Sequence, residues 1–511
     1  MGLVAISFVA MGMYIRIADL KDYIGKQARI AGWLYHGRSA GKLLFLLVRD
    51  GSGICQCVVE KGKVHDDLFA QLDHLGQESC LEVTGLVRQE PRSPGGYELA
   101  VTGARIIAKA EGYPITPKPH GIDFLMRNRH LHLRSRIPWC IARIRHTVVD
   151  AIRRFFNDRG FTLVDTPIIT TIAGEEVGSL FRLDYFGQPV ALTQTGQLYL
   201  EAAAASLGRV YCFGPTFRAE KSKTRRHLTE FWMAEPEVAF INLSGLIELA
   251  EDLVCAIVER VLEDNHPELE TIGADIEALA RVSKPFYRLT YTQVADLLTS
   301  SKTQQFMQDQ LQVLVARRSE ITSRIAELEA VLAGSSKQWQ RDKAAAELIE
   351  LRSELADLEL RIENNPKHAQ LAAQFQWGKD LGGSDETIVS QMFDKPVFVT
   401  HYPRQAKAFY MRQDRSDPKV VENFDLLAPN GFGEIIGGSM REEDYELLAA
   451  RMDQEGLKQE DYWWYLDLRR YGSFPHGGFG LGLERTVAWI TGQRHVRQCI
   501  AFPRIMDKLY L

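Results

Sequence analysis

The sequence predicts an α+β protein in which a small β-barrel is followed by a larger domain of strands and helices that carries an inserted helical hairpin. Three observations lead to this prediction. Five short apolar segments separated by turn residues occupy residues 14–110, a proline-rich segment follows them, and two heptad runs joined by a polar turn lie within residues 303–365. With 511 residues, of which 45% are hydrophobic and 25% charged, the chain has room for two to four globular domains.

The first hundred residues predict a small closed barrel of short strands with one helix near residues 65–75, an arrangement typical of the OB-fold. Such a barrel is expected to bind single-stranded nucleic acid by stacking bases on exposed aromatic rings. The alternative is a purely structural barrel that holds Trp33 and Phe45 in its core. The predicted strands are Gln27–Trp33, Leu43–Val48, Ile54–Val59, Ser79–Val87 and Glu98–Ile107.

Changes in composition predict the domain limits. Prolines at positions 114, 117 and 119 indicate a stiff interdomain linker. The apolar N-terminus has no basic region and no cleavage site, so no signal peptide is expected, and Met11 or Met13 is an alternative start to Met1. The predicted divisions are an N-terminal extension (1–13), the barrel (14–110), a hinge (111–135) and the mixed domain (136–511), with the hairpin (303–365) inside the last.

Charge and cysteine content exclude several classes. The net charge of −5 does not predict a uniformly basic surface, so a polyanionic partner would have to meet a local patch. The seven cysteines are scattered and form no CxxC pair, which predicts neither a disulfide framework nor a zinc site and favours the reducing cytoplasm. No segment approaches membrane-spanning length, and no membrane partner is expected.

The mixed domain shows helices and strands along its whole length. We expect helices at residues 137–160 and 243–262, and a strand at residues 161–169 that is bent at Pro167. A glycine-rich run at residues 476–485 precedes a helix at 486–491; its spacing is not that of a dinucleotide-binding loop, and we interpret it as backbone packed flat against a ligand with Arg485 at the helix start. Further strands are predicted at Lys395–Pro403, Phe409–Met411, Asn423–Leu427 and Gly431–Arg441.

The segment from Phe217 to Phe240 is the centre of the chain's chemistry. An apolar strand at 210–217, a charged loop and a return strand through Phe231 predict an antiparallel hairpin. Arginine side chains bind phosphates and an aromatic ring stacks on a base, so a nucleoside triphosphate is the expected ligand. The alternative is a solvated basic loop. The charged residues of the loop are Arg218, Glu220, Lys221, Lys223, Arg225, Arg226 and His227.

The two heptad runs predict an antiparallel coiled-coil hairpin. The first is formed by Ile321, Ile325, Leu328 and Leu332, and the second by Leu348, Leu351, Leu355, Leu358 and Ile362. The hairpin could be a dimerisation arm, a nucleic-acid contact or an inert insertion, and the sequence does not choose among them. As an appended element, residues 303–365 should be removable without loss of the chemistry of the mixed domain.

Together these pieces resemble the class II aminoacyl-tRNA synthetases. Residues 161–169 with Pro167 resemble motif 1, residues 217–231 motif 2, and residues 478–485 motif 3. The N-terminal barrel, the proline-rich hinge and the segment Arg129–Ser135 are similar to the asparaginyl/aspartyl subgroup. The resemblance implies an antiparallel catalytic sheet flanked by helices, ATP as a substrate with Mg²⁺ as the cofactor, and a homodimer formed through motif 1.

Two segments of the sequence indicate which amino acid is the substrate. Aspartyl members carry a lysine that faces the substrate carboxylate, and Leu200 stands at that position here, which suits a neutral amide. The segment Gly433–Glu443 resembles the asparaginyl signature, with Met440 where glutamine is common. The resemblance therefore implies ligation of L-asparagine to tRNA(Asn). An aspartyl or non-discriminating enzyme and a catalytically inactive binding protein are the alternatives; a stand-alone asparagine-making relative lacks the barrel.

The resemblance also implies roles for individual residues. The catalytic residues would be Arg218, Glu434 and Arg485. In the N-terminal barrel, Phe45 would stack on the middle base of the tRNA anticodon. The implied sets are, for ATP, Arg218, Glu220, His227, Phe231, Glu434 and Arg485; for Mg²⁺, Asp425 and Glu434; for the amino acid, Glu175, Gln197, Leu200 and Arg441; and for the anticodon, Arg38, Phe45 and Gln56.

Overall fold

The computed structural model describes residues 14–116, 120–175, 177–221, 224–334, 338–506 and 508–509. The expected N-terminal extension, with Met1, Met11 and Met13, lies outside the described residues. The chain forms two compact units, Met1–Lys118 and Pro119–Leu511. No helix in the described part of the chain is long and apolar enough to cross a membrane.

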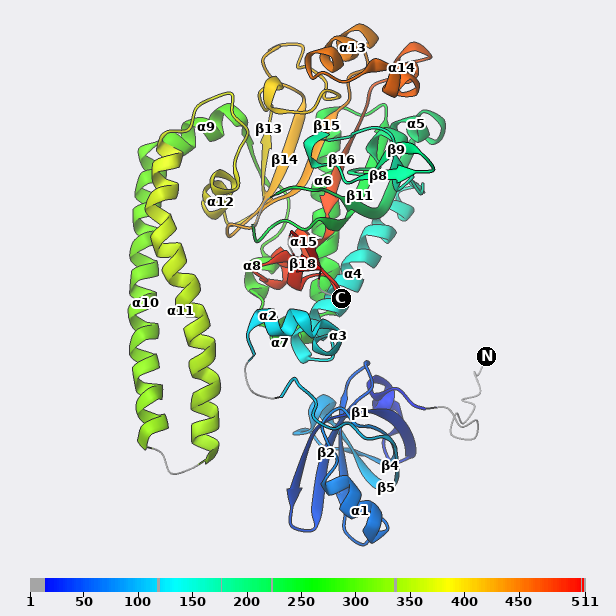
Figure 1. The fold of residues 1–511 in the computed structure, drawn as a ribbon, viewed down its shortest axis with the longest axis vertical. Helices are drawn as coiled ribbons and strands as arrows, with labels where there is room; N and C mark the ends of the chain where they lie inside the picture. The colour runs from blue at the N-terminus through cyan, green and yellow to red at the C-terminus, as the bar shows by residue number, and fades with distance from the viewer. Residues whose placement is uncertain are drawn as a thin grey trace. The chain divides into compact units, whose positions relative to one another are not determined.

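The first unit is a closed five-stranded barrel with the strand order β1-β2-β3-β5-β4, as predicted (Figure 1). The β3–β5 pair is parallel, and the other pairs are antiparallel. Its elements are β1 (Gln27–Ala40), β2 (Leu43–Arg49), β3 (Ile54–Glu60), α1 (Asp66–Asp73), β4 (Cys80–Gln89) and β5 (Tyr97–Ala108), with 3₁₀ turns at Ile17–Tyr23 and Pro94–Gly96.

Alternation along β2 decides which side chains fill the barrel. Leu44, Leu46 and Val48 are buried in its core, whereas Phe45 between them is only half-buried on the outer face. Trp33 is 37% exposed. The alternative interpretation, in which Phe45 and Trp33 belong to the core, is therefore wrong, because the period of two directs both rings outward.

The second unit is built on a large, mainly antiparallel sheet with the order β12-β13-β14-β15-β16-β11-β10-β6, to which β17 and β18 are added. A small sheet with the order β7-β9-β8 lies beside it. The strands are β6 (Thr162–Leu163), β7 (Ile169–Thr170), β8 (Arg182–Tyr185), β9 (Gln188–Leu192), β10 (Arg209–Phe217), β11 (Glu230–Ala239), β12 (Tyr287–Thr290), β13 (Val397–Thr400), β14 (Asn423–Ala428), β15 (Gly433–Met440), β16 (His476–Gly482), β17 (Arg504–Ile505) and β18 (Lys508–Leu509).

Helices α4, α6 and α15 pack on one face of this sheet and form the main core with it. The helices are α2 (Ile122–Arg127), α3 (Arg129–His132), α4 (Arg136–Asp158), α5 (Gln197–Leu207), α6 (Leu243–Asp264), α7 (His266–Ile272), α8 (Ile276–Ala280), α9 (Tyr291–Thr299), α10 (Ser301–Gly334), α11 (Gln338–Ala373), α12 (Gly383–Gln391), α13 (Tyr445–Gln454), α14 (Trp463–Arg470) and α15 (Leu483–Thr491), with 3₁₀ turns at Val177–Ser179, Arg404–Ala406, Gln459–Tyr462 and Val496–Gln498.

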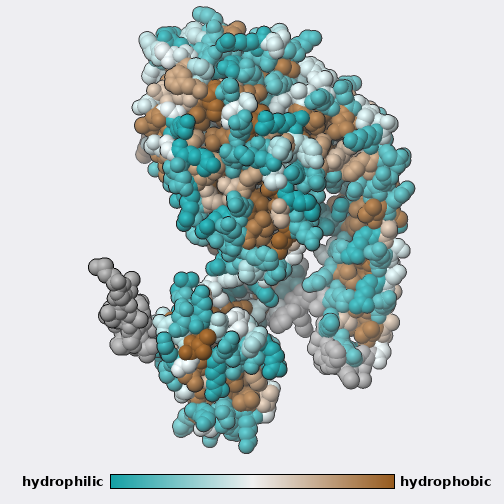
Figure 2. All heavy atoms as spheres, turned by 180° about the vertical axis from the view of Figure 1, so that it is seen from behind, coloured by the Kyte–Doolittle hydropathy of each residue, from teal (hydrophilic) through white to brown (hydrophobic). Residues whose placement is uncertain are grey.

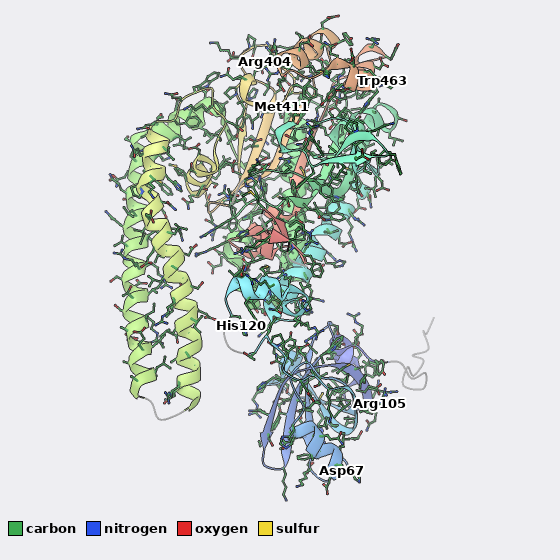
Figure 3. All side chains as sticks on the ribbon, viewed as in Figure 1. Asp67, Arg105, His120, Arg404, Met411 and Trp463 are labelled. Atoms are coloured by element: carbon green, nitrogen blue, oxygen red, sulfur yellow. The ribbon has the colours of Figure 1, made fainter. Side chains whose placement is uncertain are left out.

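Some predicted elements of this unit differ from the observed ones. Residues 161–169 form strand only at their two ends, since Pro167 cannot donate to a ladder. Residues 409–411 are not a strand: Phe409 and Tyr410 are buried in a cluster with side chains of α13 and α14. Met411, which is labelled in Figure 3, forms an isolated bridge with Arg441. The predicted hinge at 111–135 contains the short helices α2 and α3.

The coiled-coil hairpin is confirmed as α10 and α11, and it is longer than residues 303–365. Leu314, Ile321 and Leu358 form part of its seam. Helix α11 continues through Pro366 to Ala373 because Ala372 is buried in a cluster at the root of the hairpin, and this packing outweighs the missing backbone donor. The hairpin runs alongside the unit, with α12 between its root and the sheet (Figure 1). The face of the hairpin that Figure 2 shows is mainly hydrophilic, with separate apolar spots.

Candidate active site

The charged hairpin is formed by β10 and β11, paired from Arg209↔Val238 to Phe217↔Glu230. Alternation along β11 separates two faces: Ala234 and Val238 join the helical core, whereas Met233, Glu235 and Glu237 face an open cavity. The face of the sheet opposite α4 and α6 therefore carries the polar groups.

One pocket on this face collects all six residues that the sequence assigned to ATP. It is lined by Arg218, Glu220, His227, Phe231, Glu434 and Arg485, together with two glycines of β16, Gly480 and Gly482. The Arg218 guanidinium lies 5.5 Å from the centre of the Phe231 ring. The Nε atom of Arg218 is buried and has no hydrogen-bond partner among the described residues, so it is available to a ligand.

A chain of charge contacts crosses the pocket. Arg485 donates from Nη1 to Glu434 Oε2 at 2.9 Å, and its Nη2 lies 3.4 Å from His227 Nε2. His227 Nε2 is also 3.5 Å from Glu220. Burial and the Arg485 charge lower the pKa of His227, so this ring is neutral at pH 7. The arginines, rather than the histidine, supply the positive charge.

Asp425 and Glu434 converge above Gly437. A Cβ atom on Gly437 would lie 2.8 Å from Glu434 Oε1 and 3.5 Å from Asp425 Oδ1, so the glycine keeps this space open. Burial raises the pKa of Asp425 to about 6, against the pull of Lys407 Nζ 3.0 Å from its Oδ2. Burial also acts on Glu434, but Arg485 and Lys407 outweigh it and lower the pKa of this carboxyl.

The carboxylates of Asp425 and Glu434 can supply two of the ligands of a Mg²⁺ ion, but not a complete coordination sphere. Mg²⁺ in nucleotide sites is commonly held by one or two carboxylates, with phosphate oxygens and waters as the other ligands. Two carboxylate oxygens facing one open space meet that requirement. No group of three or more His, Cys, Asp or Glu side chains is placed to hold a metal within the described part of the chain, so the protein alone offers no complete cage.

A second cavity, of about 270 Å³, adjoins the nucleotide pocket and shares Arg218 and Glu434 with it. Glu175, Gln197 and Arg441, assigned to the amino acid, line this cavity. Glu175 lies 3.5 Å from Arg218, and its burial raises the pKa of its carboxyl.

Arg441 closes the inner end of the second cavity. It donates to both oxygens of Glu237, at 3.1 and 2.9 Å, and to Ser439 at 2.7 Å. Gly478 makes this contact possible, because a Cβ there would lie 2.2 Å from Glu237 Oε2. The side chains of Arg441 and Glu237 are only 4% and 1% exposed, so the ion pair is buried.

Leu200 does not line either cavity. Its side chain is fully buried in a small cluster with Ala204, Val210 and Cys212, on the face of α5 that packs against β10. Gln197 and Glu201 are four residues apart and share the other face, where Gln197 Nε2 donates to Glu201 Oε1 at 3.1 Å. The prediction that Leu200 contacts the amino acid is therefore not met by this structure.

Two charged residues in or beside the site, Glu201 and Lys407, were not predicted. Glu201 is buried and accepts from Arg469 at 2.6 Å and from Tyr465 at 2.8 Å, and it lies 3.1 Å from His476. Despite burial, Arg469 and His476 lower the pKa of Glu201. Lys407 was also missed. Of these two residues, only Glu201 could have been found from the sequence, because a carboxylate on a helix otherwise rich in alanine and leucine is buried only with a charged or polar partner.

The barrel carries the three residues assigned to the anticodon. Arg38 and Phe45 face each other across β1 and β2, and the guanidinium lies 4.5 Å from the ring centre. Gln56 lies on the same outer face and donates from Nε2 to Ser93 at 3.0 Å and to Glu98 at 3.1 Å. The arrangement presents one ring face and an amide whose carbonyl can accept a hydrogen bond.

Two family models match the chain. The model of tRNA synthetases class II (D, K and N) matches residues 121–506, and the model of the OB-fold nucleic acid binding domain matches residues 28–107. The chain therefore belongs to the class II tRNA synthetases of the D, K and N group, and its fold class is the one predicted from the sequence.

Within this group, the chain is similar to asparagine-specific members along almost its whole length. The chain is 46% identical to the asparagine–tRNA ligase of Sorangium cellulosum, over 97% of this chain and 98% of that protein. It is 44% identical to the asparagine–tRNA ligase of Chloroflexus aurantiacus, over 97% and 98%. Among solved structures, asparaginyl-tRNA synthetase from Pyrococcus horikoshii complexed with asparaginyl-adenylate matches with a TM-score of 0.81 and 36% identity, covering 98% of this chain and 100% of that one.

Proposed function

We propose that this chain is an asparagine–tRNA ligase, which activates L-asparagine with ATP and transfers it to the 3′ end of tRNA(Asn). The observation that carries the proposal is the meeting of the two cavities at Arg218. Arg218 lines both the nucleotide pocket and the second, polar cavity. An amino-acid carboxylate and the α-phosphate of ATP can therefore meet beside one positive charge.

The chemistry follows from repulsion between two anions. The carboxylate of the amino acid attacks the α-phosphate, a P–O bond to the leaving pyrophosphate breaks, and the aminoacyl-adenylate forms. Arg218 offsets charge at the α-phosphate, and Arg485 offsets charge on the leaving group. When Mg²⁺ is bound, Asp425 and Glu434 would hold it, and it would neutralise phosphate charge. Phe231 would stack on the adenine ring.

Charge balance around Arg441 supports a neutral side chain. The buried side chains of Arg441 and Arg469 are matched there by the carboxylates of Glu237 and Glu201. A carboxylate side chain would therefore meet no surplus positive charge at this end of the cavity, whereas an amide can both donate and accept hydrogen bonds. This balance favours asparagine over aspartate.

The experiment that tests the proposal is amino-acid-dependent ATP–pyrophosphate exchange. Exchange with asparagine and not with aspartate is the expected result. Exchange with aspartate as well would make the enzyme non-discriminating, and exchange with neither amino acid would favour a binding protein. Aminoacylation of tRNA(Asn) completes the test.

We also propose that the protein is a cytoplasmic homodimer formed through the motif 1 region. Apolar side chains of this region are exposed in the single chain: Leu163 is 43%, Ile168 44% and Ile169 44% exposed. All seven cysteines are free, as the cytoplasm favours. Light scattering that gives the mass of one chain at micromolar concentration would contradict the dimer.

Replacing Phe45 by alanine in the barrel is expected to raise the KM for tRNA about tenfold, because stacking of a base on an aromatic ring contributes about 1–3 kcal/mol. Asparagine-dependent exchange should stay unchanged, since it needs no tRNA. Phe186, a 91% exposed ring in the other unit, provides the control variant F186A. An equal loss of exchange in F45A would show a folding defect instead of a recognition defect.

A further inference from the structure

Asp357 on α11 connects the inserted hairpin to the charged loop between β10 and β11 (residues 218–229), which we call the ATP-binding loop. Its Oδ1 accepts from Arg225 Nη1 of that loop at 2.5 Å, and its Oδ2 is paired with Arg494, which follows α15. The Asp357 side chain is only 13% exposed, whereas the other ion pairs of the hairpin are more exposed, such as Glu347, at 34%, with Arg324. Both oxygens of Asp357 are thus engaged outside the hairpin.

Arg225 is adjacent to residues that bind the nucleotide in the proposed reaction. The carbonyl of Arg225 accepts from the Val496 backbone at 3.0 Å. The next residue, Arg226, donates to Thr387 at 2.6 Å and to the carbonyl of Gly431, and its own carbonyl lies 3.5 Å from Arg485 Nε. His227 follows. The pair with Asp357 therefore fixes the loop next to its phosphate-facing residues.

The surroundings of Asp357 are strongly basic. A cavity of about 580 Å³ lies between the hairpin and the sheet. Among the described residues that line it, Asp357 is the only one with a carboxylate, and the arginines are Arg225, Arg226, Arg361, Arg485 and Arg494. Arg361 is one turn beyond Asp357 on α11, and burial and the nearby Arg225 lower its pKa. Arg226 and Arg485 line the nucleotide pocket as well. Without Asp357, neighbouring guanidinium groups would repel one another at the edge of that pocket.

We propose that Asp357 is a positioning residue that holds the ATP-binding loop through Arg225, so that the hairpin contributes to binding of the triphosphate. The proposal rests on the proposed function for its kinetic readout. It replaces the expectation that residues 303–365 are dispensable for adenylate formation. A heptad pattern defines the seam of a hairpin, but it contains no information on what the outer face of α11 contacts.

The test is the KM for ATP in asparagine-dependent exchange. D357A and D357N are expected to raise this KM at least threefold, with the KM for asparagine and kcat within twofold of the parent. D357E, which restores the charge, should recover most of the affinity. The matched control E347A removes a carboxylate that pairs only within the hairpin and should behave as the parent.

A double variant tests whether Asp357 acts through Arg225. R225A/D357A should have the same KM for ATP as R225A, because Asp357 acts through Arg225. A rise below threefold in both D357A and D357N, an equal rise in the KM for asparagine, or additive effects in the double variant would each overturn the proposal. If the parent shows no exchange with any amino acid, the proposed function fails, and calorimetric ATP binding by the parent, D357N and E347A still decides the role of Asp357 by the same threefold limit.

Discussion

Replacement of Arg485 by alanine is expected to lower kcat/KM for asparagine-dependent ATP–pyrophosphate exchange by about a thousandfold, the loss typical for one preorganised charge at a reacting group. Arg485 lies in the first turn of α15, which follows the glycine-rich strand β16, and its guanidinium contacts Glu434 at 2.9 Å and approaches His227. Because His227, with its lowered pKa, is neutral at pH 7, it cannot replace the lost positive charge.

Two further variants make this prediction specific. R485K keeps one charge but not the planar fork, so it should recover only part of the activity. R260A removes an arginine of α6 that pairs with Glu263 and Asp264 along its own helix, and it should leave exchange within twofold of the parent. Exchange by R485A within tenfold of the parent would show that Arg485 does not act on the leaving group.

The nucleotide pocket could be predicted because its residues follow one another closely along two strands. Arg218, His227 and Phe231 belong to a single hairpin, so the spacing in sequence fixes their proximity in space. Arg485 follows a glycine-rich strand, and a helix start is a recognisable place for a phosphate-binding charge. Local geometry was sufficient for these residues.

Leu200 shows that spacing in the sequence does not predict the direction in which a helical side chain points. A position within a motif fixes where the backbone lies, but on a helix adjacent residues point about 100° apart. The side chain of Leu200 packs against β10, and Gln197 and Glu201 occupy the face that contacts the polar groups. The direction of the side chain depends on which strand the helix packs against, and only the structure shows this.

Lys407 and Asp357 were missed for a different reason. Lys407 lies in an irregular segment after β13, where no periodicity exists, and it is placed beside Asp425 by tertiary contacts alone. Asp357 occupies an outer position of a heptad, where an acid is ordinarily solvated. Both residues pair with groups distant in sequence, and a single sequence contains no signal for such pairs.

Replacement of Arg441 by alanine is expected to destabilise the second unit by about 3–5 kcal/mol, because it leaves the carboxylate of Glu237 buried without its partner. Arg441 and Glu237 share three hydrogen bonds and are almost completely buried. The same change removes a guanidinium from the inner end of the amino-acid cavity, so exchange with asparagine should be lost. Urea unfolding followed by circular dichroism measures the first effect.

The double variant R441A/E237A separates stability from recognition. Removal of both charges eliminates the uncompensated carboxylate, so the double variant should be more stable than R441A, while exchange with asparagine should not return. Recovery of exchange in the double variant would contradict a direct role of Arg441 in the cavity. Equal urea midpoints for R441A and the parent would contradict the buried ion pair.

The instability of R441A should also depend on pH. Burial already raises the pKa of Glu237 in the parent, against the opposing effect of Arg441, and loss of Arg441 raises it further. The carboxyl of the unfolded chain titrates near its ordinary value, about 4.3. Between these two pKa values the folded variant binds a proton that the unfolded chain does not bind, so lowering the pH favours the folded state. The deficit in unfolding free energy relative to the parent should therefore be largest near pH 8 and smaller at pH 5.5, and a deficit that grows as the pH falls would assign the instability to another group.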